Sequence, residues 1–294
     1  MLANEQPSMW MGDGLDWTAC KVIMRYTFEG KDHTSNRRAL VRSDTGAQLG
    51  IVSDGYRIVQ PKELLLSFGR LCRSIGFKIT KHGSLRGGRR VCAFAETEDA
   101  EGFELPGDDR VIRNLLLMTS YDRSTSTQVL QTSMRVACWN QLRTIMSDKV
   151  TAVLFRLSHM SREVGERLEE SRWTLDADWD IFRAQAYRLA DTSVLDFNAR
   201  RYFMDVLYPD RTEVSRSMIR KADRLFDIYK HAPGQELPSA KGTAWGMVNA
   251  VSYWTDHGRS AKMSDNRRDQ AWFGRGAEIK ARALRVAGSL LQAA

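Results

Sequence analysis

The stretch Pro61-Lys-Glu-Leu-Leu-Leu-Ser-Phe-Gly-Arg-Leu-Cys-Arg-Ser-Ile-Gly76 predicts a helix that packs on a sheet. Proline is favoured at the first position of a helix, apolar residues recur here at three-to-four spacing, and Gly76 is a typical stop signal. A basic hairpin should follow, with strands over 77–81 and 90–97 around a glycine-rich turn from Gly83 to Arg89. Helix and hairpin together indicate an α+β fold.

Further β-rich runs lie on both sides of this stretch, and turn residues separate them. The expected strands cover residues 20–28, 38–42, 48–52, 56–59, 111–121, 125–132 and 151–159. A short helix is expected over 137–147. These segments predict a large, mainly antiparallel sheet carrying one packed helix.

Helical periodicity dominates the second half of the chain. The expected helices cover residues 160–190, 195–207, 214–230, 243–257 and 276–293, none with an interior proline. We therefore divide the chain into an N-terminal segment (1–17), a basic β-rich nucleic-acid-binding domain (18–158) and a helical domain (159–294). The tryptophans of the helical half are expected to form core or subunit contacts, so the protein should be a homo-oligomer.

Composition narrows the class of protein. Hydrophobic residues make up 43% and charged residues 27% of the 294 residues, which is typical of globular proteins and excludes wholesale disorder. The longest apolar run, Val91 to Ala95, is too short to span a membrane, and the N-terminus lacks a signal-peptide pattern. Four cysteines occur singly, without a C-x-x-C pair. We expect a cytoplasmic protein with reduced structural thiols and no membrane contact.

The net charge of +8 is unevenly distributed. Residues 37–90 hold twelve basic and three acidic side chains, a local net charge of +9, and residues 257–294 hold eight basic and three acidic ones. The rest of the chain is therefore acidic overall. A basic segment of this kind indicates either a polyanion-binding face or a solvated surface, and the sequence leaves both open.

Common catalytic motifs are absent. There is no G-x-x-x-x-G-K-[ST] phosphate loop, G-x-G-x-x-G, H-E-x-x-H, G-x-S-x-G or kinase signature, so we expect no cofactor and an ATP-independent, non-catalytic protein. A metal-dependent nuclease is the weaker alternative, through Asp176, Asp178 and Asp180 or the Glu278-Ile-Lys280 sequence. Aspartates beside Trp179 are more typical of a helix start, where carboxylates favour the dipole.

The remaining hypothesis is a binding surface for single-stranded DNA, in which cations hold phosphates and aromatic rings stack on bases. Tyr56, Tyr121 and Trp139 lie near the basic residues in sequence, although Tyr121 and Trp139 also fit core positions. The candidate phosphate ligands on and around the hairpin are Lys78, Lys81, Arg86, Arg89 and Arg90, and the candidate groove residues are Arg42, Arg57, Arg123 and Arg135.

Several segments resemble a known family. Arg42-Ser-Asp-Thr-Gly46, Tyr56-Arg-Ile-Val59, Arg135-Val-Ala-Cys-Trp-Asn140 and Trp245-Gly-Met-Val-Asn-Ala-Val251 are similar to the phage/plasmid-like protein family, a bacterial and prophage domain of unknown function. The resemblance implies a phage or mobile-element gene acting in the bacterial cytoplasm. It names no activity.

A second resemblance, of layout rather than motif, points to Rad-type single-strand annealing recombinases. Both have antiparallel strands, a helix following a Tyr-x-Ile-Val segment, a Gly-Phe step and a basic hairpin. It implies oligomeric rings that hold single-stranded DNA in a basic groove without ATP. The alternative is a phage or plasmid counter-defence protein whose basic face binds an acidic host or phage protein.

Overall fold

The computed structural model describes residues 14–97, 102–137, 140–143, 153–157, 166–258 and 264–290. They form two compact units. Unit 1 comprises Met1–Glu98, Leu115–Leu130 and Val153–Glu170, and unit 2 comprises Asp99–Asn114, Gln131–Ala152 and Ser171–Ala294. The units do not follow a single division at residue 158, because two segments of the β-rich half group with the helices.

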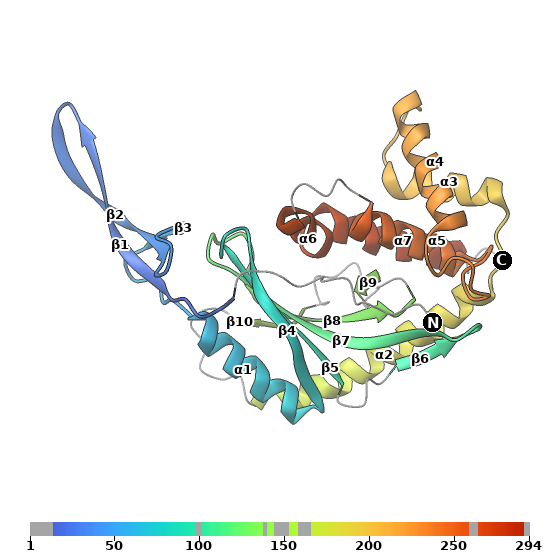
Figure 1. Ribbon diagram of the computed structural model, residues 1–294, viewed down its shortest axis with the longest axis horizontal. Helices are drawn as coiled ribbons and strands as arrows, with labels where there is room; N and C mark the ends of the chain where they lie inside the picture. Colours follow the sequence, from blue (N-terminus) through green and yellow to red (C-terminus); the bar gives the residue numbers. More distant parts are fainter. Residues whose placement is uncertain are drawn as a thin grey trace, which may run out of the picture. The chain divides into compact units, whose positions relative to one another are not determined.

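The strands and helices confirm the expected α+β class, with antiparallel sheets followed by helices (Figure 1). The strands are β1 (Ala19–Phe28), β2 (Lys31–Arg42), β3 (Gln48–Ser53), β4 (Phe77–Leu85), β5 (Arg90–Thr97), β6 (Gly102–Leu105), β7 (Asp109–Ser120), β8 (Thr127–Arg135), β9 (Asn140–Arg143) and β10 (Val153–Leu157). The helices are α1 (Pro61–Ser74), α2 (Glu166–Asp191), α3 (Asp196–Leu207), α4 (Arg216–His231), α5 (Ala244–His257), α6 (Ser264–Trp272) and α7 (Arg275–Leu290).

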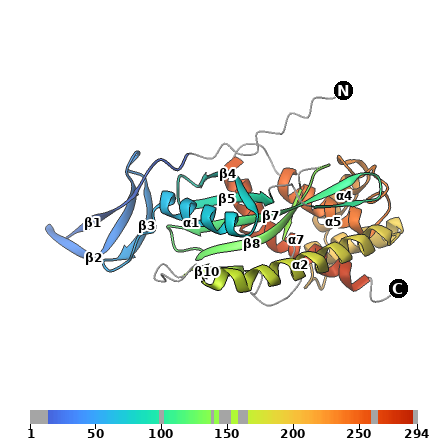
Figure 2. The same cartoon turned by 90° about the horizontal axis from the view of Figure 1, so that it is seen from below.

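Unit 1 contains two sheets. One has the order β1-β2-β3, and the other follows the path β10-β8-β7-β5-β4, with β7 and β8 continuing into unit 2. Helix α1 begins at Pro61, as expected, and packs on β4 and β5 (Figure 2). The Gln60 side chain exchanges two hydrogen bonds with the backbone of Ala19, which ties the start of α1 to β1.

The β4–β5 hairpin is confirmed, but β4 runs on to Leu85, so its turn is shorter than expected. The expected strand over 56–59 is wrong. Tyr56 instead donates its N–H to the carbonyl of Ser53, and this turn ends β3 and brings the chain to α1.

The expected helix over 137–147 is also wrong where the structure describes it. Residues 140–143 form β9, which pairs with β8. A short apolar run fits either structure, and the neighbouring strand decides. Strand β6 and helix α6 were not expected.

Unit 2 is built around α5, which packs against α4 and α7. Trp245, Met247, Val248 and Val251 of α5 are fully buried, because this helix is apolar on nearly all sides. Phe103 of β6 contacts Trp179 and Phe182 of α2 and closes one side of this core. The tryptophans at 179, 245, 254 and 272 are buried, as expected.

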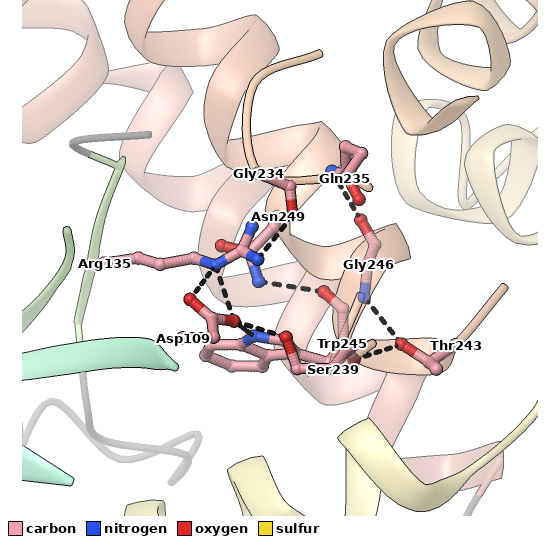
Figure 3. A network of polar contacts seen from close by, with 9 residues as sticks. All are labelled: Asp109, Arg135, Gly234, Gln235, Ser239, Thr243, Trp245, Gly246 and Asn249. Carbon is pink, nitrogen blue, oxygen red and sulfur yellow. Dashed lines mark hydrogen bonds and ion pairs between the residues drawn. The ribbon is translucent and has the colours of Figure 1, made fainter. Parts of the chain in front are cut away.

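A buried ion pair crosses this core. Arg135 Nε lies 2.7 Å from the Asp109 carboxylate, and the two side chains are 1% and 0% exposed. Figure 3 shows that the same carboxylate also accepts hydrogen bonds from Ser239 Oγ at 2.6 Å and Trp245 Nε1 at 3.1 Å. Arg135 therefore ties β8 to β7 and to the segment that precedes α5.

Among the helices that the structure describes, none combines the length and the apolar composition that a membrane-spanning helix needs.

Candidate nucleic-acid interface

In unit 1, two turns far apart in the sequence meet beside β3. One turn joins β4 to β5, and the other follows β7. The Tyr121 N–H donates to the Arg89 carbonyl at 2.8 Å and holds the turns together. Beside this bond lies a cavity of about 490 Å³, lined by residues 48–51 of β3 and by Arg89, Asp122 and Arg123.

One expected phosphate ligand, Arg89, and one expected groove residue, Arg123, thus line the same cavity. Both side chains are exposed. Arg89 Nε also donates to the Gln48 carbonyl at 3.4 Å, which directs the side chain along β3. Tyr56 is half-buried; burial raises its pKa, and the charge of Arg123 opposes that rise. The cavity itself is lined by two cations, Arg89 and Arg123.

The backbone of both turns is strained. Arg86 and Arg123 have φ of 55° and 65°, in the left-handed region that costs an ordinary residue about 1–2 kcal/mol. Strain of this kind clusters at binding sites, where surrounding structure enforces it. Gly88, at φ 94°, lies against Trp17 and Arg42, where a Cβ atom would meet the Arg42 side chain at 2.8 Å.

Asp122 is the acidic member of the cavity. Burial alone would raise the pKa of its carboxyl, but hydrogen bonds from Ser124 and Ser120 and the charge of Arg90 together lower the pKa below its ordinary value. Its Oδ1 accepts the Ser124 N–H at 2.9 Å. The carboxylate therefore stabilises its own turn, and its negative charge lines the cavity together with the guanidinium groups of Arg89 and Arg123.

Arg42 and Arg90 are buried beneath these turns. This differs from the expectation that Arg42 lines an open groove and that Arg90 binds phosphate at the surface. Arg42 is 5% exposed, pairs with Asp44 at 2.7 Å and lies 4.7 Å from the Trp17 ring centre. Arg90 is 9% exposed and donates to Ser124 Oγ at 3.2 Å.

Arg135 likewise does not line a groove, because its buried guanidinium pairs with Asp109 and donates to the Gly234 carbonyl inside unit 2. Four further candidates lie elsewhere in unit 1. Arg57 is exposed between β3 and α1, Lys78 and Lys81 lie on edge strand β4, and Arg86 is exposed at the hairpin turn. The structure thus brings Arg89 and Arg123 together around one cavity.

Tyr121 is a core residue, as its sequence position allowed. It is 1% exposed, donates its hydroxyl to the Val59 carbonyl at 2.7 Å and meets Trp17 edge-on. Burial raises its pKa well above the ordinary range. Trp139 and Cys138 lie outside the described residues.

The aspartates considered for a nuclease lie inside α2 rather than at its start, so the helix-start interpretation is wrong. Asp176 pairs with Arg113 at 2.8 Å and Asp180 with Arg183 at 3.0 Å. Burial raises the pKa of Asp178. Across the part of the chain that the structure describes, no three His, Cys, Asp or Glu side chains are grouped to hold a metal ion.

Sequence reasoning missed the contribution of β3 to the cavity. Gly50 comes so close to the Tyr121 backbone that a Cβ atom there would lie 2.3 Å from the Tyr121 carbonyl oxygen. A glycine inside a strand often marks such an approach, so Gly50 was the available signal.

The chain belongs to the family described as Domain of unknown function (DUF932), which matches residues 48–272. No curated protein and no solved structure matches the chain. The matched region includes the β3–hairpin cavity and most of unit 2, and it begins after β1 and β2.

Proposed function

We propose that this protein binds single-stranded DNA through the β3–hairpin cavity and anneals complementary strands without ATP. The observation that carries the proposal is the meeting of Arg89 and Arg123 at one cavity, from turns separated in the sequence. Guanidinium groups bind phosphate oxygens in a bidentate manner and stay charged at any physiological pH. Tyr56, half-buried and within reach of the Arg123 charge, would offer a ring to an unpaired base.

The wider setting belongs to the same proposal. A phage or mobile-element protein acting in the bacterial cytoplasm as a homo-oligomer would meet single strands during recombination. Exposed Lys78 and half-buried Lys81 on β4, with exposed Arg57 and Arg86, would extend the phosphate path away from the cavity. The layout resemblance to Rad-type annealing recombinases motivates the annealing step.

Fluorescence anisotropy with a labelled oligonucleotide, single-stranded and then duplex, tests the proposal. The variant is Arg89→Glu/Arg123→Glu, since both side chains are exposed and their loss leaves the core intact. Arg90 is left unchanged, because reversing a buried charge would unfold the turn. The matched control is Arg216→Glu/Arg220→Glu, which reverses two exposed arginines on α4 in unit 2.

We expect tight single-strand binding by the wild-type and control proteins and a loss of at least about tenfold in the cavity variant. An annealing assay with complementary strands should lose rate in parallel. Equal affinity of all three proteins would refute the assignment of the cavity. A different result would favour the counter-defence alternative: the protein binds no DNA, and it stays bound to an acidic protein after nuclease has removed nucleic acid.

A further inference from the structure

The ribbon formed by β1 and β2 presents apolar rings to solvent. Phe28 and Lys31 flank a two-residue turn, Glu29–Gly30, in which both residues have positive φ (48° and 73°), as type I′ hairpins require. The turn end of the ribbon extends away from β3 (Figure 1). Tyr26 and Phe28 are 56% and 62% exposed there.

These rings share one face. Tyr26 and Phe28 are two residues apart on β1, and cross-strand pairing places His33 opposite Tyr26 and Lys31 opposite Phe28. The rings of Tyr26 and His33 are stacked, with centroids 5.3 Å apart and planes 17° apart. Three exposed rings and one ammonium group thus lie on one face of the ribbon, here called the ribbon platform (Tyr26, Phe28, Lys31, His33).

The ribbon is also basic. Lys21 and Arg38 contact Asp54, whereas Arg25, Lys31 and Arg37 are exposed along the strands. From Ala19 to Arg42 the sequence holds six basic residues against two acidic ones. This charge favours a polyanionic partner over an apolar protein surface, and exposed rings beside cations are the features that bind unpaired bases and their phosphates.

We propose that the ribbon platform stacks on unpaired bases of a nucleic-acid strand and makes the protein selective for single strands over duplex. The inference rests on the proposed function and extends it, because the cavity arginines contact phosphates, which both forms carry. In a duplex the bases are already stacked on one another, so only a single strand offers their faces to the platform. The ribbon lies before residue 48 and outside the matched family region.

The test measures the affinity of each protein variant for each of three DNAs. Tyr26→Ala/Phe28→Ala removes two exposed rings, and Leu195→Ala/Phe197→Ala is the control, since those side chains are 75% and 74% exposed in unit 2. Each protein is titrated with a single strand, the same strand carrying abasic sites, and a duplex. Tyr26→Trp/Phe28→Tyr keeps the rings and should restore binding.

One stacked base is worth about tenfold in affinity, so we expect the ring-deletion variant to lose about tenfold or more on the single strand. Its affinity for the duplex and for the abasic strand should equal that of the wild type, because no base stacking is left to remove. An equal loss on all three DNAs, or no loss on the single strand, would overturn the inference.

Two other results separate this inference from the proposed function. If the ring deletion leaves DNA binding intact while Arg89→Glu/Arg123→Glu abolishes it, the cavity assignment holds and the platform assignment fails. If the ring deletion instead dissociates an oligomer in sedimentation velocity without changing DNA affinity, the ribbon contacts a second copy of the chain and the inference is wrong. Lack of any DNA binding by the wild-type protein would overturn both.

Discussion

Replacing Asp109 by asparagine tests whether Arg135 is a core residue or a DNA ligand. The substitution keeps the shape of the side chain but removes the charge that faces the Arg135 guanidinium. The Arg135 guanidinium would stay buried but lose the Asp109 carboxylate, and breaking a buried pair in this way costs about 3–5 kcal/mol. We therefore expect the free energy of unfolding to fall by that amount.

The magnitude follows from the contacts of the pair. Both side chains are essentially inaccessible to water, and the Asp109 carboxylate accepts hydrogen bonds from Arg135, Ser239 and Trp245. A surface pair provides the control. Asp180 and Arg183 are 62% and 48% exposed, so Asp180→Asn should change the free energy of unfolding by about 1 kcal/mol or less.

Urea unfolding followed by tryptophan fluorescence measures both variants, since Trp245 lies in the network. A fall for Asp109→Asn no larger than that for Asp180→Asn would refute the reasoning. So would a fully stable Arg135→Gln protein with impaired DNA binding, because Arg135 would then act as the ligand that its sequence context first indicated.

Three further outcomes are expected. Gly50→Ala should lower the free energy of unfolding by about 1–3 kcal/mol, because its Cβ would collide with the Tyr121 carbonyl oxygen; an unchanged urea midpoint would contradict this. Arg123→Gly should weaken DNA binding but change the free energy of unfolding by no more than about 1 kcal/mol. Glycine adopts φ of 65° without strain, and this gain offsets the entropy that a more flexible glycine loses on folding. Marked destabilisation with intact DNA binding would count against the site. Mass spectrometry after thiol labelling at pH 8 should find exposed Cys20 modified and buried Cys72 unmodified, because burial raises the Cys72 pKa to about 12 and suppresses its thiolate; equal labelling would disprove the burial.

Local signals in the sequence were sufficient for most of the fold. Pro61 and the apolar spacing after it predicted α1, and the five long helical patterns correspond to α2, α3, α4, α5 and α7. Residues 140–143 show where such signals fail. Their strand conformation depends on pairing with β8, which a local pattern does not contain.

The site was predictable only in part, for a related reason. Residue type and charge selected Arg89 and Arg123 as candidates, and both line the cavity. The same criteria also selected Arg42, Arg90 and Arg135, which are buried by partners distant in the chain, such as Asp109 for Arg135. Charge shows which side chains could bind phosphate, whereas long-range packing determines which of them remain accessible.

The salt dependence of binding decides whether Arg89 and Arg123 contact phosphates. Each contact to a single strand contributes about 0.7 to the slope of log affinity against log salt concentration. The slope for Arg89→Glu/Arg123→Glu should therefore be shallower than that of the wild type by about 1.4, whereas Arg216→Glu/Arg220→Glu should keep the wild-type slope. Identical slopes for all three proteins would show that the cavity arginines do not bind the DNA backbone.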